Sequence, residues 1–412
     1  MELKKEIRER FSQDVDFPQE MLFGALHEAL SKIDGNTKTF INTFPRPCST
    51  NYVYPGILNG GEWDDWTSGF WTGMLWLAYE ITGEERYRKT AFFQIKSYDE
   101  RITNKVAVNH HDLGFLYTPS VVAGYKITGN ERAKNAGLKA ADHLIKRYKE
   151  KGEFIQAWGD LDDPTAYRLI IDCNLNVPLL FWATEVTGDP KYREIATKHL
   201  HTAASVVVRE DSSTHHTFYF DPETGKPTKG VTAQGASDNS AWARGQAWGV
   251  YGFPLAYSYL KDEKFIDLYK RVTNYFLNHL PADDVCYWDL SFDDLSGEEK
   301  DSSAAAIAVC GMLEMDKYLP DSDPDKKIYQ NAVKRIMNSL IKNYSTKDME
   351  RCNGLLKEAV YSKPHGIGVE ECCIWGDYFY MEALVRIMKP EWKKYLSLIH
   401  ISEPTRQTPI SY

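Results

Sequence analysis

The 412-residue sequence lacks several features that mark particular classes of protein. It contains no apolar run of about 18 residues, so we expect no membrane-spanning helix and no membrane partner. It has no basic stripe and a net charge of −9, which argues against nucleic acid as a partner. The N-terminal stretch MELKKEIRERFSQDVDF is charged and lacks the apolar segment of a secretory signal peptide.

Cysteine is also sparse, and none of the seven cysteines forms a CxxC pair. An odd number without a pairing framework is typical of reduced thiols, so we expect a cytoplasmic protein. We further expect a monomer or a weak homo-oligomer. The sequence has no HExxH motif, and the adjacent His110 and His111 are poorly spaced to reach one ion together. We therefore predict neither a metal nor a cofactor.

Long alternating strand patterns are scarce, and helical patterns dominate instead. Apolar residues recur at i, i+3 and i+4 in about twelve stretches, near residues 18–34, 67–82, 85–102, 114–128, 131–149, 175–187, 190–207, 242–260, 263–279, 301–318, 326–343 and 375–389.

A repeated turn joins these helices in pairs. YEITGEERYRKTA (79–91), GYKITGNERAKNA (124–136) and ATEVTGDPKYREIA (183–196) each end one helix at Thr-Gly and open the next with a capping or acidic turn. Six such hairpins predict an all-α fold, the (α/α)6 barrel or six-hairpin toroid, and a right-handed superhelix of the HEAT-repeat type is the alternative. We expect one catalytic domain over 1–395. Long segments at 151–174, 208–241 and 345–374 would then gather at one end.

The last stretch, LSLIHISEPTRQTPISY (396–412), breaks the helical pattern. It is similar to translated sequencing adapter, and we interpret it as non-native sequence that carries no function.

Aromatic residues are abundant, with 11 Trp, 25 Tyr and 18 Phe. Many lie beside Asp, Asn, Gln and Gly, a combination that suits sugar binding because rings stack on C–H faces while polar groups bond hydroxyls. A large aromatic core is the alternative explanation. Trp66 precedes a predicted helix and is the better candidate for a sugar platform, whereas Trp71 and Trp76 fit a core role.

Two carboxylates stand at matching places in successive hairpins. Asp172 interrupts the apolar run RLIIDCNLNVPLLFW (168–182), and Asp112 lies in NHHDLGFLYTPS (109–120). In a toroid both would face one cavity, where a pair of carboxylates is the minimal set for acid–base chemistry on a sugar. Helix capping is the competing explanation for each.

The segment from 214 to 252 supplies further candidates, among them His216, Gln234, Arg244 and Trp248. The planar fork of Arg244 would bind a substrate carboxylate. Pairing with a protein Asp explains this residue equally well.

Together these segments resemble a known family. NHHDLGFLY, IIDCNLNVPLLFWA, HTFYFDPETG, WARGQAWGVYGF and IWGDYFYMEAL, in this order, are similar to motifs of unsaturated glucuronyl hydrolases, glycoside hydrolase family 88. The resemblance covers about residues 20–390 and implies an (α/α)6 barrel. It implies that Asp172 is the general acid and base and that Asp112 is its essential partner. The residues that it places around an unsaturated uronate substrate are Trp66, His111, Trp158, His216, Gln234, Arg244, Trp248, Tyr361 and Ser362.

The sequence departs from the family members that prefer sulfated substrates. Those members resemble each other in an arginine before Gln-Gly and in a later Ser-x-x-Ser-x-Lys run. Here Ala233 precedes Gln-Gly, and the later run SKPHGI retains Ser362 but has His365 and Ile367 instead. The resemblance therefore implies a weak preference for 6-sulfated disaccharides, unless Lys363 compensates in part.

Three other functions remain open from the sequence. The nearest is unsaturated rhamnogalacturonyl hydrolysis of pectin fragments by the same chemistry. A sugar epimerase on the same toroid would use histidines for proton transfer and would tolerate loss of the Asp172 acid. A non-catalytic oligosaccharide-binding protein would bind without turnover.

Overall fold

The computed structural model describes residues 1–62, 65–393 and 395. The predicted adapter-like tail, 396–412, lies outside the described residues. Within them no helix is both long and apolar enough to cross a membrane.

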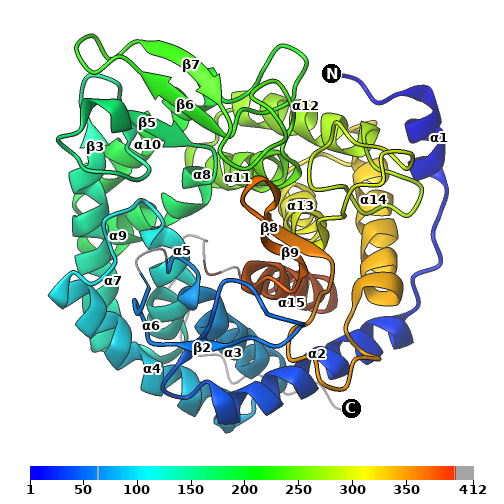
Figure 1. Cartoon of the computed structure of the whole chain (residues 1–412), viewed down its shortest axis with the longest axis horizontal. Helices are drawn as coiled ribbons and strands as arrows, with labels where there is room; N and C mark the ends of the chain where they lie inside the picture. Colours follow the sequence, from blue (N-terminus) through cyan, green and yellow to red (C-terminus); the bar gives the residue numbers. More distant parts are fainter. Residues whose placement is uncertain (63–64, 394, 396–412) are drawn as a thin grey trace.

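Six helical segments form an inner ring in the described chain (Figure 1). Each inner segment contacts the next, and the last contacts the first. This closure confirms the toroid and excludes the open superhelix. The inner segments are α3 (Ser68–Thr82), α5–η1–α6 (Leu113–Tyr117, Thr118–Val122, Ala123–Thr128), α8–α9 (Cys173–Asn176, Pro178–Thr187), α11 (Ala243–Leu260), α13 (Ser302–Met315) and α15 (Ile374–Met388).

The inner helices are apolar on nearly all sides, as in the α13 sequence SSAAAIAVCGMLEM, because neighbours surround them. The outer helices are amphipathic and bury one face. The sequence analysis did not predict the short helix α1 (Lys5–Ser12). It packs on the outside of α14 (Lys326–Ser339). The outer helices are α2 (Gln19–Thr39), α4 (Glu85–Asn104), α7 (Glu131–Leu144), α10 (Pro190–Val206), α12 (Lys264–Asn278) and α14 (Lys326–Ser339).

The repeated Thr-Gly turn has one structure at all three places. Gly83, Gly129 and Gly188 each end a helix in the left-handed conformation, with φ of 73°, 68° and 75°. The preceding Thr hydroxyl accepts a hydrogen bond from the residue after each glycine. The turn therefore reverses the chain from an inner helix to the next outer one, as the repeat predicts.

Several predicted helices are shorter or interrupted. The 114–128 helix contains the π-helical turn η1 around Pro119, and the 175–187 helix is interrupted before Pro178, because proline has no N–H for the helical ladder. The 131–149 helix ends at Leu144 and continues as η2 (Ile145–Arg147) and strand β3 (Tyr148–Lys149). The 326–343 helix finishes as η4 (Leu340–Tyr344).

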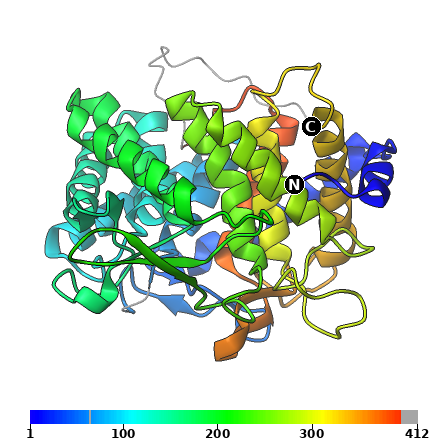
Figure 2. The same ribbon diagram turned by 90° about the horizontal axis from the view of Figure 1, so that it is seen from above.

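Short antiparallel strands occupy one end of the ring (Figure 2). The strand pairings are β1 with β2, β3 with β4, β5 with β6 and β7, and β8 with β9. They come largely from the long segments that were expected to gather there. The remaining strands are β1 (Phe44–Pro45), β2 (Gly56–Ile57), β4 (Phe154–Ile155), β5 (Arg168–Ile170), β6 (Thr217–Phe220), β7 (Pro227–Val231), β8 (Ala359–Ser362) and β9 (Ile367–Glu371).

The inner helices approach one another closely where they begin. A Cβ on Gly69 would lie 2.2 Å from the carbonyl oxygen of Phe115, and one on Gly114 would lie 2.2 Å from the Cα of Asn176. Only glycine allows this contact. The N-termini of α3, α5 and α8 therefore meet at the strand end of the ring.

A buried ion network joins three inner helices. Arg386 of α15 contacts Glu314 of α13 at 2.9 Å and Glu382 at 2.8 Å, and it donates to the hydroxyl of Tyr251 of α11 at 2.7 Å. Each charged side chain of this network is at most 3% exposed. Each charge is stabilised mainly by its partners because water is excluded.

Replacing Arg386 by Met should lower the free energy of unfolding by about 3–5 kcal/mol, because two buried carboxylates lose their shared cation. Urea unfolding followed by circular dichroism measures this change. Arg132→Met, which removes a surface pair with Asp99, is the control and should cost less than about 1 kcal/mol. Equal losses in both variants would contradict the role of the buried network.

Candidate active site

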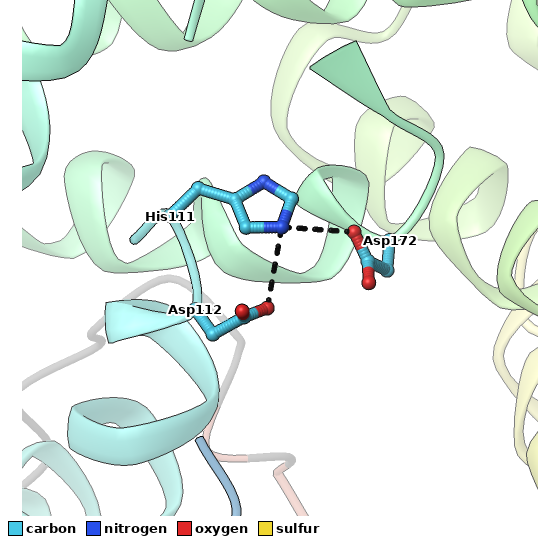
Figure 3. A group of neighbouring side chains, drawn as sticks. All are labelled: His111, Asp112 and Asp172. Atoms are coloured by element: carbon cyan, nitrogen blue, oxygen red, sulfur yellow. Dashed lines mark ion pairs between the residues drawn. The ribbon is translucent and has the colours of Figure 1, made fainter. Parts of the chain in front are cut away.

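Asp112 and Asp172 stand at equivalent places, at the N-cap positions of α5 and α8. Their side chains are partly open, with 16% and 17% exposed. The side chain of His111 lies between them, as Figure 3 shows. Its Nε2 is 3.3 Å from Oδ1 of Asp112 and 3.2 Å from Oδ1 of Asp172. The structure thus brings together two carboxylates from hairpins that are 60 residues apart in sequence.

The two carboxyl groups have opposite pKa shifts. Burial and the negative charge of Asp112 raise the pKa of Asp172 well above its ordinary value. Burial would also raise the pKa of Asp112, but His111, His110 and the Asn176 amide outweigh it and lower that pKa. Of the two groups, Asp172 is therefore the one that favours holding a proton, and Asp112 is the one that favours the negative charge.

His111 is the neutral member of this cluster. Burial lowers its pKa to about 4, and its backbone N–H donates to the carbonyl of Ala157 at 2.8 Å. A neutral imidazole can donate one hydrogen bond from Nε2 to the ionised carboxylate. At 1% exposure, His111 lies behind the carboxylates rather than beside open solvent, so its geometry fits support of the pair better than direct substrate binding.

The same three side chains are the group in the described chain that could surround a metal ion, with ligand atoms within 4.8 Å of one another. A carboxyl group that retains its proton is a poor metal ligand, because metals bind the deprotonated form. The raised pKa of Asp172 is the direction that acid–base work requires.

Aromatic side chains line the region beside the carboxylates. Trp66 stacks on Trp375 with 5.1 Å between ring centroids and donates from Nε1 to the Tyr361 hydroxyl at 2.9 Å. It also contacts Phe115, which in turn contacts Trp248. Trp66 is partly exposed, as a sugar platform requires, whereas Trp248 is 1% exposed and is part of the core.

His216 is placed near Asp172 by the β5–β6 pairing, because its carbonyl accepts from Ile171 N–H at 3.1 Å. Burial lowers the pKa of His216 to about 3, so the ring is neutral. Nδ1 accepts from the Ala233 N–H at 3.2 Å, which leaves the ring proton on Nε2. Trp158, 36% exposed, lies 6.4 Å away between ring centroids.

Arg244 is buried and pairs with the protein itself. One terminal nitrogen contacts Asp301 at 3.4 Å, and the other donates to Gln234 Oε1 at 2.8 Å and to the Tyr361 carbonyl at 2.6 Å. This arrangement favours the second explanation raised by the sequence, pairing with an Asp. Arg244 thus holds Gln234 and strand β8 in place and supplies positive potential near Asp172.

Ser362 lies at the end of β8, where its hydroxyl and His365 Nδ1 are 2.7 Å apart. The next residue, Lys363, forms an ion pair with Glu299. Lys363 was the residue considered as a replacement for the missing cationic contacts to sulfate. It already has a carboxylate partner in Glu299.

Two residues in direct contact with candidate site residues escaped the sequence analysis. Asp301, the N-cap of α13, accepts from the Ser303 and Ala304 N–H groups and also pairs with Arg244. Asn176 contacts Asp112 at 3.3 Å. The signal for Asn176 was available, because it lies four residues after Asp172 and so on the same face of a helix.

Acid–base chemistry on a sugar needs a proton donor, an anionic partner and flat apolar side chains. All three occur at the strand end of this helical ring. The fold and site together define a glycoside hydrolase.

The chain belongs to Glycosyl Hydrolase Family 88, whose family model matches residues 32–390. It is 52% identical over 387 residues to the unsaturated chondroitin disaccharide hydrolase of Streptococcus pneumoniae, covering 94% of this chain and 96% of that protein. The crystal structure of unsaturated glucuronyl hydrolase from Streptococcus agalactiae has a TM-score of 0.91 at 50% identity, over 96% and 98% of the two chains.

A mutant of the S. agalactiae protein, complexed with dGlcA-GalNAc6S, has a TM-score of 0.84 at 47% identity and covers 96% and 100% of the two chains. These comparisons confirm the family resemblance and the α/α toroid.

Replacing Asp112 by Asn should lower the pKa of Asp172, because a neighbouring negative charge that opposes its ionisation is removed. Carboxyl 13C chemical shifts of aspartate-labelled protein, followed against pH, measure this change. Asp99→Asn, at an outer helix, is the control and should leave the titration of Asp172 unchanged. An unaltered Asp172 titration in Asp112→Asn would show that the two groups are not coupled.

Proposed function

We propose that this enzyme removes 4,5-unsaturated glucuronic acid from the non-reducing end of oligosaccharides produced by polysaccharide lyases, glycosaminoglycan-type disaccharides in particular. The observation that carries the proposal is the pair of Asp112 and Asp172 around His111, with the pKa of Asp112 lowered and that of Asp172 raised. The substrate class is supported by the relatives, which are named unsaturated glucuronyl or chondroitin disaccharide hydrolases.

The unsaturated sugar is an enol ether, with a C4=C5 double bond next to the ring oxygen. Asp172 gives its proton to C4, and positive charge develops at C5 and the ring oxygen. This step needs a carboxylic acid that is still protonated near neutral pH. The ionised Asp112 stabilises the positive charge.

After the transfer, Asp172 is a carboxylate and takes a proton from the water that attacks C5. The product is a hemiketal, which opens and releases the remaining sugar. The glycosidic bond is thus lost through hydration of the double bond, without a glycosyl-enzyme intermediate. The relation between carboxylate separation and stereochemical outcome does not apply to this route.

The site also suits an anionic sugar. The helices α3, α5 and α8 begin at this end of the ring, and helix N-termini carry partial positive charge. Arg244 adds positive potential, and the Nε2–H of His216 is a donor for a hydroxyl or carboxylate oxygen. We assign substrate contacts to Trp66, Trp158, His216, Gln234, Tyr361 and Ser362, and supporting roles to His111, Arg244 and Trp248.

We place the activity in the cytoplasm of the producing cell, because all seven cysteines are free thiols and free thiols are typical of a reducing compartment. A monomer or weak homo-oligomer suffices, because the assigned residues all come from one chain.

The test is loss of ultraviolet absorbance by the unsaturated uronate across a panel of lyase products. We expect turnover of unsaturated chondroitin-type disaccharides and little turnover of unsaturated rhamnogalacturonan fragments. Asp172→Asn and Asp112→Asn should each lose at least about 100-fold in kcat, the scale of lost general acid catalysis. Asp189→Asn, at an exposed helix cap on α10, is the control and should retain full activity.

Two results would overturn the proposal. Near-normal turnover by Asp172→Asn would favour an epimerase-type mechanism. Binding of the disaccharide without loss of absorbance would indicate a binding protein.

The preference for 6-sulfated disaccharides should be weak, because Ala233 and Ile367 provide no cation and Glu299 neutralises Lys363. We expect kcat/KM values within roughly 10-fold for 6-sulfated and unsulfated unsaturated chondroitin disaccharides, about one ion-pair contribution. Glu299→Gln releases the lysine and should shift the ratio toward the sulfated substrate. A large preference of the unaltered enzyme for the 6-sulfated disaccharide would contradict this prediction.

A further inference from the structure

Asp112 occupies a helix N-cap position, yet the capping bond is made by another residue. An Asp at this position normally accepts from an N–H group of the first turn. Here the third residue of α5, Phe115, donates its N–H to Oδ1 of Asn176 at 2.8 Å. Asn176 belongs to α8, in the neighbouring hairpin. Because this cap comes from the adjacent inner segment, the carboxylate of Asp112 is left available for other contacts.

The amide nitrogen of Asn176 contacts both Asp112 and Asp172. Its Nδ2 is 3.3 Å from Oδ1 of Asp112 and 3.4 Å from the backbone carbonyl of Asp172. One fully buried side chain therefore joins the start of α5, the Asp112 carboxylate and the backbone of Asp172. An amide is suited to this place because it accepts and donates without carrying charge.

The backbone around Asn176 leaves little freedom for this arrangement. A Cβ on Gly114 would lie 2.2 Å from the Asn176 Cα and 2.3 Å from its carbonyl oxygen. The starts of α5 and α8 are thus in direct contact. The position of the Asn176 amide relative to Asp112 follows from this contact.

We propose that Asn176 is a positioning residue for Asp112: it caps α5 in place of Asp112 and donates a hydrogen bond that holds this carboxylate against His111 and Asp172. The inference rests on the acid–base roles proposed above. It makes Asn176 part of the mechanism although the residue itself contacts no solvent and no substrate.

The pKa of Asp112, compared between the unaltered enzyme and variants at position 176, reports on this role. The donor hydrogen bond favours the ionised form, so its loss should raise the pKa of Asp112. Asn176→Ala leaves unaltered the other titratable or charged groups around the pair, which are His110, His111, Asp172, Cys173, Arg147 and Arg244. Asn176→Asp adds a carboxyl group beside them, whose negative charge also raises the pKa of Asp112.

Two variants separate capping from positioning. Asn176→Asp keeps the acceptor for the Phe115 N–H but replaces the donor by a charge, whereas Asn176→Ala removes both. We expect kcat to fall roughly 10- to 100-fold in each, with KM changed less than about 3-fold, because the lost contact acts on general acid–base catalysis. The acid limb of the kcat/KM profile, where Asp112 must be ionised, should move up by roughly one pH unit.

The matched control is Asn331→Asp in the outer helix α14. Asn331 is also fully buried, and its Nδ2 donates to the Phe11 carbonyl at 2.9 Å. This variant should lose stability yet keep the pH profile of the unaltered enzyme. If Asn176→Asp and Asn176→Ala also keep that profile and kcat, after correction for the folded fraction, Asn176 is merely structural and the proposal is wrong.

A measurement on the unaltered protein makes the test independent of turnover and of variant folding. The side-chain amide proton resonances of Asn176 should move with pH as Asp112 titrates, and this movement should vanish in Asp112→Asn. Amide resonances that do not follow Asp112 would overturn the positioning role even in an active enzyme. Conversely, an inactive enzyme whose Asn176 resonances do follow Asp112 would overturn the proposed function alone.

Discussion

The site depends on the short distance between two carboxyl groups whose pKa values are shifted in opposite directions. Asp112 and Asp172 lie on either side of His111, at 3.3 and 3.2 Å from its Nε2. Ligand atoms of the three side chains lie within 4.8 Å of one another, so ionisation of one carboxyl group opposes ionisation of the other. The pKa of Asp172 is thus raised first by burial and then by the charge of Asp112, which is the direction that proton donation to an electron-rich double bond requires.

The groups behind the pair determine which carboxyl group holds the proton. Histidines and the Asn176 amide surround Asp112 and favour its charge. Asp172 has weaker support, because burial and the charge of Asp112 outweigh the backbone N–H groups of Asp172 and Cys173 that favour its ionised form. Arg244 reduces the shift of Asp172 but is itself tied to Asp301 and Gln234. The asymmetry of the pair thus originates in buried polar side chains that do not face the substrate.

Much of the fold could be predicted from local patterns. The 3.6-residue period and the Thr-Gly turns located the main helices, because both signals depend on neighbours in sequence. Helix ends were less accurate where tertiary contacts or proline intervene, as at η1 and before Pro178. Helix α1 was missed because it is short and strongly charged, and its stability comes from packing on α14.

The carboxylate pair could be predicted because Asp112 and Asp172 hold equivalent positions in successive hairpins, and the family motifs assigned their roles. The partners of Arg244 could not be predicted, since Asp301 and the β8 carbonyls are 57 or more residues away in sequence. The spacing of Asn176 from Asp172 was visible in the sequence, but its cap on α5 was not, because that hydrogen bond crosses 61 residues.

The sequence by itself determined the helical pairs, the carboxylates placed before two of the inner helices and the family. The tertiary structure alone decided which of these residues meet, which are solvent-exposed and which carboxyl group retains the proton. The physical reason is that propensity and turn chemistry act over a few residues. Ring closure, desolvation and charge coupling instead depend on distances that exist only once the hairpins have packed together.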